Sequence, residues 1–429
     1  MTKQMVNSNI EWVKEIPKTW QIDRIKHLIN DNLSIRRGKI DTNVLSLTTK
    51  GVVIKEDLLF GMNPENYDNH KIVHKGDYVI CLRDLDGPLL CGISEYDGCL
   101  SGLYFVLRIN EKKVTYKYFD LIMKSMGYVD ALDGQSYGMR HSYNYEQFCE
   151  LRVAFPSLEE QDKITAYLDR KCLKINELIT KHNDIIEKLL QFKKTIITNA
   201  VTKGLNPNVK TKNSETNWID KIPADWNIVP LKIRFNFGKG LSITKSDLVK
   251  NGLPVISYGQ IHAKNCTGVH ITNDLIRYVP EGFSIYKDSF ANNNDFIFAD
   301  TSEDLEGCGN CIYVDNDGVY AGYHTILLSS KYSDNNKYLG YLFKTDIWRY
   351  QIRTQLTEVK LYSITQSCLK QTEILLPTKD EQRDIVDYLD KKCLAIDELI
   401  TRQKEAIEKL EEYKKSLIYN VITGKMEVK

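Results

Sequence analysis

Few residues of this sequence have types and spacing that could support catalysis. Asp97, together with Glu111, Lys112 and Lys113, has the composition of a metal-dependent nuclease site, in which carboxylates hold Mg²⁺ and a lysine polarises the attacking water. Similar spacings arise easily in a sequence in which 27% of the residues are charged. These residues are therefore weak evidence for catalysis, and a self-contained enzyme that cuts or modifies DNA is kept as one alternative hypothesis.

Two further patterns resemble ligand sites but are incomplete. Cys308-Gly-Asn-Cys311 is a lone pair of thiols, whereas structural zinc needs four ligands and His324 could supply only a third. Residues 237–240 (FGKG) resemble a cofactor-binding glycine loop, but they lack the βαβ context and the downstream acidic residue of that motif. We therefore predict that this chain holds no metal and no cofactor and has no catalytic residues.

Any functional residues must be positioned by a chain of 429 residues, which is long enough for two or more domains. We find no apolar run that resembles a signal peptide or a membrane span, and the ten cysteines follow no disulfide framework. These features predict a cytoplasmic protein. The net charge of +1 argues against a protein that wraps DNA alone, but it allows local basic patches if partners share the backbone contacts.

An internal repeat organises the chain. Residues 156–202 align without a gap onto residues 377–423, and 24 of the 47 positions are identical, which chance does not produce. A shorter repeat opens each half, where residues 12–20 (WVKEIPKTW) match residues 218–226 (WIDKIPADW). The sequence is therefore divided into a first head (1–20), a first variable block (21–155), a first helix (156–204), a linker with the second head (205–226), a second variable block (227–376) and a second helix (377–429).

The two variable blocks resemble each other only faintly. Short strands separated by turn signals are predicted in both, with helical stretches at 116–127 and 336–349, so we interpret each block as a compact α+β domain. A constant frame around divergent blocks is the pattern expected when one scaffold presents two binding specificities. Duplication followed by drift is the simpler alternative, but it does not explain why the helices stayed alike.

Both repeated segments have strong signals for the start and the end of a helix. Ser157 with Glu160, and Thr378 with Glu381, form the capping-box pattern that satisfies free amides at a helix start. No proline or glycine follows until Gly204 in the first copy and Gly424 in the second. These signals predict two long helices.

A heptad of apolar residues along each helix predicts a coiled-coil seam. Both helices belong to one chain, and the simplest pairing is antiparallel about a pseudo-two-fold axis. His182 and Gln403 occupy the same heptad position near the middle of the two helices. We expect a polar contact between them that fixes the register, although a partly exposed His182 without that contact is an equal alternative.

These elements together resemble the specificity (S) subunits of type I restriction-modification enzymes. The resemblance covers essentially the full length and depends on the Pro-x-x-x-Glu-Gln-x-x-Ile helix starts at 156–164 and 377–385, the Ile-Pro-x-x-Trp heads at 16–20 and 222–226, and the two divergent blocks. It implies two target recognition domains that each read half of a split, asymmetric sequence in double-stranded DNA. The first block is shorter than the second, so we expect it to have reduced reading loops.

The resemblance also implies partners. Two methyltransferase (M) subunits that use S-adenosylmethionine would dock on the paired helices, and restriction (R) subunits would add cleavage driven by ATP in the presence of Mg²⁺. From residue type and expected loop placement alone, we select as candidate DNA contacts Arg36, Arg37, Lys39, Arg83 and Arg140 in the first block and Lys239, Lys245, Gln260, Arg353 and Lys360 in the second. A coiled-coil scaffold without a DNA function is the third hypothesis, beside the adaptor and the enzyme.

Overall fold

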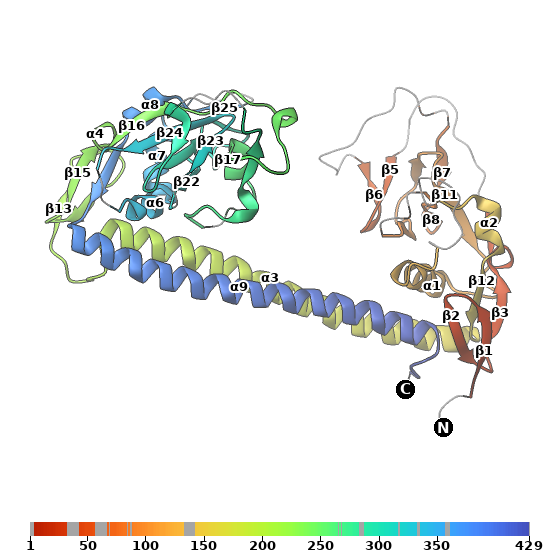
Figure 1. The fold of residues 1–429 in the computed structure, drawn as a ribbon. Helices are drawn as coiled ribbons and strands as arrows, with labels where there is room; N and C mark the ends of the chain where they lie inside the picture. Colours follow the sequence, from red (N-terminus) through yellow and green to blue (C-terminus); the bar gives the residue numbers. More distant parts are fainter. Residues whose placement is uncertain are drawn as a thin grey trace. The chain divides into compact units, whose positions relative to one another are not determined.

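The computed structural model describes residues 4–31, 43–55, 67, 69–83, 85, 88–132, 142–264, 266, 268–282, 287–315, 318–332, 335–356 and 361–428. The chain forms two compact units (Figure 1). The first unit comprises Met1–Asn183 with Gln403–Lys429, and the second comprises Asp184–Arg402. Each unit therefore contains one head, one variable block, the start of one long helix and the end of the other.

The first unit begins with a hairpin of β1 (Met5–Ile10) and β2 (Val13–Pro17). The chain then enters the domain through β3 (Gln21–Arg24) and leaves it through β12 (Arg152–Phe155), and these two strands pair antiparallel. Because the entry and exit strands are paired, the head lies beside the start of the long helix α3 (Leu158–Lys203). Trp20, between β2 and β3, is buried there in the core of the unit.

The domain of the first unit has two four-stranded sheets, with strand orders β4-β11-β8-β9 and β6-β5-β10-β7. Helix α1 (Tyr116–Tyr128) packs on β9 and is capped by Thr115, whereas the short α2 (Tyr145–Glu150) has a complete capping box. The strands span Ile29–Asp31 (β4), Asn43–Thr48 (β5), Gly51–Ile54 (β6), Lys71–Val73 (β7), Tyr78–Ile80 (β8), Cys91–Ile93 (β9), Gly98–Leu100 (β10) and Phe105–Ile109 (β11).

The second unit is built in the same way. Its head is the hairpin of β13 (Thr211–Asn213) and β14 (Lys221–Pro223), and its entry and exit strands are β15 (Asn227–Pro230) and β26 (Glu373–Leu376). The sheets have strand orders β16-β24-β20-β22 and β18-β17-β23-β19. Their strands span Phe235–Lys239 (β16), Leu253–Ile256 (β17), Arg277–Val279 (β18), Phe290–Ala291 (β19), Phe296–Ala299 (β20), Cys311–Tyr313 (β22), Val319–Ala321 (β23) and Thr325–Ser330 (β24).

Five short helices and a small extra sheet complete the second domain. The extra sheet pairs β21 (Thr301–Ser302) with β25 (Tyr362–Ser363). The helices are α4 (Leu231–Arg234), α5 (Tyr258–Ile261), α6 (Lys337–Phe343), α7 (Asp346–Arg353) and α8 (Gln366–Lys370). The helical stretch predicted over 336–349 is divided into α6 and α7, because Thr345 ends α6 with a bond to the Leu342 carbonyl and caps α7 by accepting from the Trp348 amide.

The two domains share one topology although their sequences differ. One sheet of each domain shows the same strand pairing. In the first domain β5 is parallel to β10 and antiparallel to β6, and in the second domain β17 is parallel to β23 and antiparallel to β18. A buried aspartate precedes the central strand in both copies. Asp77 accepts from the His74 amide at 2.8 Å, and Asp295 accepts from the Asn292 amide at 2.9 Å. The structure therefore relates the two blocks more clearly than the sequence does.

The long helices α3 (Leu158–Lys203) and α9 (Lys379–Ile422) run antiparallel in each unit (Figure 1). In the first unit Asn176 meets Lys414 and His182 meets Gln403, so the partner's number falls as α3 advances. In the second unit Lys193 meets Asp397, and Gly204, just past α3, lies against Glu381. The predicted fold class, two mixed α/β domains with an antiparallel pair of long helices, is confirmed. In the part of the chain that the structure describes, no helix is long and apolar enough to cross a membrane.

Candidate nucleic-acid interface

Aromatic and imidazole side chains gather on one group of loops in the second domain. The loop of residues 322–324, between β23 and β24, lies beside the first residue of α5. The ring centroid of Tyr258 is 6.0 Å from that of Tyr323 and 5.6 Å from that of His324, and the last two rings are 4.0 Å apart. Tyr323 is 41% exposed, so this cluster is accessible from solvent.

Hydrogen bonds hold the backbone of the 322–324 loop in place. The Gly322 amide donates to the Ile256 carbonyl at 2.7 Å, and the Tyr323 amide donates to Ser257 Oγ at 3.1 Å. His324 adopts a left-handed backbone with φ of 52°. A non-glycine residue in that region costs on the order of 1–3 kcal/mol and persists where the surroundings enforce it, often at functional sites.

Asp300 orients the ring of His324. Its Oδ1 lies 3.0 Å from Nδ1 of His324, an arrangement that places a proton on Nδ1 and leaves Nε2 as the acceptor of a neutral ring. The hydroxyl of the neighbouring Thr301 donates to the same Asp300 atom at 2.7 Å and is buried. Because the Thr301 side chain is buried, its hydroxyl is not accessible to a substrate. The group therefore suits recognition better than nucleophilic catalysis.

The first domain carries an equivalent loop at residues 102–104, between β10 and β11. Leu107 pairs with Tyr78 as Leu328 pairs with Phe296, so Gly102 and Leu103 stand where the second domain has Tyr323 and His324. Leu103 is 51% exposed. Tyr104, the counterpart of Thr325, packs with Cys81 on the apolar core of this domain, and burial raises its pKa. The two domains therefore present different chemistry from the same position of a shared fold.

Sequence reasoning missed this loop as a binding element and considered His324 only as a third zinc ligand. No signal marked it, because Gly102 and Leu103, the residues equivalent to Tyr323 and His324, have different side chains. The correspondence depends on recognising β11 and β24 as the same strand, and the sequence did not show it.

Among the candidate DNA contacts of the second domain, Lys239 and Gln260 border this loop. Lys239 ends β16 and is exposed, and the next residue, Gly240, donates its amide to the Thr325 carbonyl at 3.0 Å. Gln260 lies on α5, where its Oε1 accepts from the Ser257 amide at 3.0 Å, so its position is fixed. Lys245 is exposed in a 3-10 turn beyond β16.

Arg353 has a structural role in this arrangement. Its guanidinium donates to Asp346 Oδ1 and to the Glu306 carbonyl, each at 2.9 Å, and the side chain is 18% exposed. These contacts are within the domain, so Arg353 is a weaker candidate for DNA than its residue type indicates. Lys360 lies outside the described residues.

In the first domain the structure describes one of the five candidates. Arg83 is exposed, three residues past β8, at the end of the sheet where β11 begins. It therefore lies at the same end of the sheet as the 102–104 loop. Arg36, Arg37, Lys39 and Arg140 lie outside the described residues.

The residues considered for metal chemistry do not converge. Among the described residues, no group of three or more histidine, cysteine, aspartate or glutamate side chains could hold a metal ion. Asp97 accepts from the Lys75 amide at 3.2 Å. Cys308 and Cys311 are buried thiols, and burial raises the pKa of Cys311 to about 11. Both thiols are therefore protonated core residues at neutral pH.

The starts of the two long helices make matching contacts with the heads. Ser157 Oγ accepts from the Glu160 amide at 3.4 Å, and Thr378 Oγ1 accepts from the Glu381 amide at 3.3 Å. The glutamates also reach the head tryptophans. The indole of Trp20 donates to Glu160 at 3.2 Å, and that of Trp226 donates to Glu381 at 2.8 Å.

The repeated glutamine after each glutamate has an anchoring role. Gln161 is fully buried; its Nε2 donates to the Pro156 carbonyl at 3.0 Å, and its Oε1 accepts from the Thr115 amide at 2.9 Å. Gln382 repeats the bond to its own proline, Pro377, at 2.9 Å. These bonds give a physical reason for the Glu-Gln pair in both copies. The sequence revealed the pair but not its partners.

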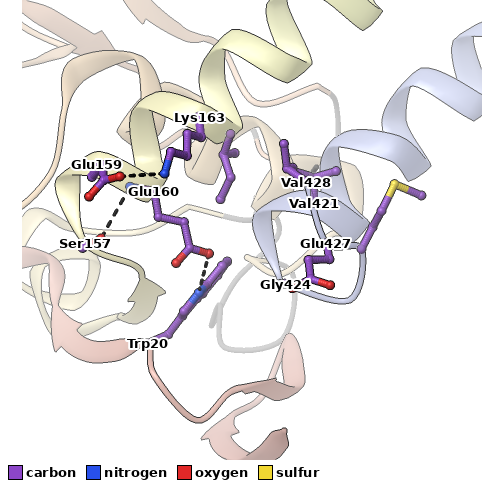
Figure 2. Close-up of a pocket in the computed structure, with 11 residues that line it drawn as sticks. Trp20, Ser157, Glu159, Glu160, Lys163, Val421, Gly424, Glu427 and Val428 are labelled. Atoms are coloured by element: carbon purple, nitrogen blue, oxygen red, sulfur yellow. Dashed lines mark hydrogen bonds and ion pairs between the residues drawn. The ribbon is translucent and has the colours of Figure 1, made fainter. Parts of the chain in front are cut away.

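A pocket of about 340 Å³ lies beside the helix start in the first unit (Figure 2). Figure 2 shows the Trp20 indole pointing at Glu160, with Lys163 paired to Glu159 above them. The opposite wall is formed by the end of α9, including Val421 and Gly424. The first head, the start of α3 and the end of α9 therefore meet at one place.

The middle of the helix pair contains the polar contact considered for the register. Nδ1 of His182 lies 2.6 Å from Oε1 of Gln403, and both side chains are half-buried. The bond requires the proton of a neutral ring to be on Nδ1. His182 and Gln403 are equivalent positions of the two repeats, so this contact marks the point where each helix meets its own counterpart.

Known proteins resemble this chain in sequence. A sequence model of the family described as "Type I restriction modification DNA specificity domain" matches residues 223–409. The type I restriction enzyme MjaVIII specificity subunit of Methanocaldococcus jannaschii is 25% identical over 287 residues, which cover 66% of this chain and 64% of that protein, slightly under two thirds of its length. A putative MjaX specificity subunit of the same organism is 25% identical, with 97% of this chain and 96% of that protein covered.

The fold also has a close counterpart among solved structures. One chain from "Structural basis underlying complex assembly and conformational transition of the type I R-M system" superposes with a TM-score of 0.66 at 16% identity, covering 96% of this chain and 99% of that one. The superposition shows a shared fold, and the named relatives are described as specificity subunits. This chain is therefore similar to the specificity subunits of type I restriction-modification enzymes, and its residues 223–409 match the model of that family's DNA specificity domain.

Proposed function

We propose that this chain reads a two-part, asymmetric DNA sequence, with residues 21–155 reading one half and residues 227–376 reading the other. It performs no chemistry on the DNA itself. Its long helices hold two adenine-methyltransferase subunits over the target, and restriction subunits join the same assembly. Methylation of a base requires that the base be flipped from the stack, and we assign that step to the methyltransferase partners.

One observation carries this proposal. The two domains have the same strand order, yet the equivalent loops differ in chemistry, with Gly102 and Leu103 in one and Tyr323 and His324 in the other. A shared frame with different reading loops is what two different half-sites require. A scaffold without a DNA function would have no reason to keep the frame and change the loops.

An exchange of domains tests the proposal. Residues 21–155 are replaced by the corresponding block of another specificity subunit, and methylated adenines are sequenced in cells that also express the methyltransferase partner. We expect one half of the methylated motif to change while the other half stays the same. The reciprocal exchange of residues 227–376 should change the opposite half. If both halves change in either experiment, or neither does, the assignment of one domain to one half-site is wrong.

The outer faces of the helices support the docking of two equal partners. Exposed apolar side chains recur at equivalent positions, in pairs with nearly equal exposure: Leu173 with Leu394 (60% and 63%), Leu178 with Leu399 (44% and 43%), and Phe192 with Tyr413 (55% and 55%). Large side chains exposed on a helix face mark interaction surfaces when they cluster.

Each unit contains one complete set of these side chains. In the first unit the bond of Lys414 to Asn176 places Tyr413 level with Leu178, and Leu173 lies nearer the start of α3. In the second unit the bond of Lys193 to Asp397 places Phe192 level with Leu399. We call these sets the first and second docking patches. Two matching patches suit two copies of one partner, and this supports a pair of methyltransferase subunits.

The cofactors of the assembly belong to these partners in our proposal. S-adenosylmethionine would bind the methyltransferase subunits, and ATP with Mg²⁺ would bind the restriction subunits. We place the assembly in the cytoplasm, which agrees with the free state of all ten cysteines. Incubation of the purified chain with DNA, Mg²⁺ and S-adenosylmethionine should give neither cleavage nor methylation, whereas either reaction would favour the self-contained enzyme.

A further inference from the structure

The 322–324 loop has the properties of a surface that is shaped before it binds. Both sides of the loop are tied to neighbouring elements: the Tyr258 amide donates to the Tyr323 carbonyl at 3.1 Å, and the Asp300 amide donates to the His324 carbonyl at 3.1 Å. The hydroxyl of Thr325 closes the loop on the Gly322 carbonyl at 2.7 Å. An interface that is rigid in the free protein loses little conformational freedom on binding.

The close packing of the loop explains why a glycine stands at its first position. A Cβ atom on Gly322 would lie 2.4 Å from Ser257 Oγ and 3.1 Å from the Ile256 carbonyl oxygen. The loop can approach β17 and α5 only without that atom. Tyr258 and Tyr323 are thereby brought to the same surface as His324.

The exposed groups of the loop can distinguish bases. With Nδ1 of His324 donating to Asp300, Nε2 is an acceptor, and such an acceptor matches the exocyclic amino group of adenine or cytosine in the major groove. The phenol of Tyr323 can donate or accept, and its ring is large and stiff. A phosphate contact would favour cations, but the centre of this cluster is formed by neutral side chains, with Lys239 at its border.

We infer that the 322–324 loop, with Tyr258 beside it, is the element that reads base identity in the half-site of the second domain. His324 accepts from an exocyclic amino group through Nε2, Tyr323 contacts the neighbouring base pair, and Asp300 is a positioning residue for His324. Lys239 contacts the phosphate backbone of the DNA rather than the bases. This inference rests on the proposed function and names the residues through which the second domain performs it.

Base-pair discrimination by the complete methyltransferase complex tests this inference. The complex of this chain with its methyltransferase subunits is titrated with duplexes in which each base pair of the methylated motif is changed singly. The test variants are His324→Asn, which tolerates the left-handed backbone, and Tyr323→Phe, which keeps the ring and its packing. Tyr350→Ala is the matched control, because Tyr350 is a 52% exposed tyrosine on α7 of the same domain.

We expect His324→Asn to reduce discrimination at one A·T or G·C position by about 5- to 150-fold, with the other positions unchanged. That position must lie in the half of the motif that changes when residues 227–376 are exchanged. Tyr323→Phe should relax an adjacent position, and Tyr350→Ala should relax none.

Two results would overturn the inference. One is an unchanged preference at every position in both test variants. The other is an equal loss of affinity for all duplexes, which would mark the loop as a phosphate contact. If the wild-type complex methylates no two-part motif, the proposed function is wrong and the inference is wrong with it. If the wild-type complex methylates such a motif but the test variants give either of the two results above, only the inference is wrong.

Discussion

His182 and Gln403 form a polar contact that packs less well than apolar residues would but that favours one register of the helices. Both occupy the seam of the helix pair, where an apolar residue would pack better, yet their side chains meet at 2.6 Å. A polar pair in a seam is satisfied only in one register, because any slip of the helices separates donor from acceptor. The pair therefore favours one alignment of the two helices over its alternatives.

A double-mutant cycle measures this contact. His182→Leu alone should lower the free energy of unfolding by about 1 kcal/mol, because Gln403 keeps a half-buried oxygen without its donor. Replacement of both residues by leucine should restore or exceed the wild-type stability. Chemical denaturation of the wild type, of His182→Leu, of Gln403→Leu and of the double variant gives the four free energies of unfolding. Purely additive effects of the two substitutions would show that the side chains do not interact.

Asp23 is the clearest source of pH dependence in the first unit. Burial opposes ionisation, but hydrogen bonds from Lys113 at 2.8 Å and from His27 at 2.6 Å outweigh it and hold the pKa of Asp23 well below its usual range. A carboxyl group whose pKa falls on folding stabilises the protein above its unfolded pKa near 4. That contribution is lost as the pH falls through the folded pKa.

We therefore expect Asp23→Asn to lower the melting temperature at pH 7 and to matter less at pH 3. The comparison is the difference in melting temperature between wild type and variant at the two pH values, which removes the general effect of acid. Glu11→Gln, an exposed substitution in the head of the same unit, serves as the control. A difference that stays constant between pH 7 and pH 3 would contradict the stated role of the Asp23 carboxylate.

The paired helices offer a matched comparison at equivalent contacts. Lys193 is buried and reaches both carboxylate oxygens of Asp397 at 2.7 Å, whereas its counterpart Lys414 meets the neutral Asn176 at 2.8 Å. Asp397→Asn should cost about 1–2 kcal/mol, because a buried charge loses its partner. Asn176→Asp should gain about 0.2–1 kcal/mol, since that pair is more exposed. Thermal unfolding of both variants should show shifts of opposite sign.

The glycines after the long helices should differ in their tolerance of a side chain. Gly204 and Gly424 have φ values of 77° and 72°, so alanine at either position costs about 1–2 kcal/mol from backbone strain. The added Cβ at 424 would also lie 2.4 Å from two ring atoms of Pro17, whereas at 204 the nearest atom belongs to the flexible side chain of Glu381. Gly424→Ala should therefore lower the melting temperature more than Gly204→Ala. Equal shifts would show that Pro17 in the first head moves away from the added Cβ as easily as the Glu381 side chain does.

The long helices could be predicted because their signals are local. The capping residues, the absence of proline and glycine, and the seven-residue spacing all act within a few turns. The strands of the domains gave weaker signals. The pairing of β5 with β10 or of β17 with β23 joins segments far apart in sequence, and no local pattern specifies such a partner.

The candidate site was predictable only in part for the same reason. Lys239 and Gln260 were selected by residue type, and the structure places both at the border of the 322–324 loop. His324 and Tyr323 could not be selected, because their roles come from Asp300 and Tyr258, which other strands bring to them. Arg353 has the residue type of a DNA contact but is occupied by Asp346.

The docking patches lead to a prediction for the whole assembly. Leu173→Glu combined with Leu178→Glu changes only exposed positions in the first patch, and Leu394→Glu combined with Leu399→Glu is the equivalent change in the second. Each double variant should bind one methyltransferase subunit instead of two, because a buried glutamate at an apolar contact is costly. Native mass spectrometry of the purified complexes counts the subunits. Two bound subunits in both variants would show that the partners dock elsewhere.

Each long helix contributes residues to both units, and this affects the order in which the two units are completed during translation. The second unit is a continuous stretch, Asp184–Arg402, whereas the first needs Gln403–Lys429 to complete its core, in which Leu417 and Ile418 pack with Ile164 and Leu168. The hydroxyl of Tyr419 even donates to the carbonyl of Trp12, a bond between residues 407 positions apart. A ribosome releases the N-terminal segments long before it supplies these partners. We therefore expect the first unit, although its synthesis begins first, to complete its core only after residues 403–429 have been made.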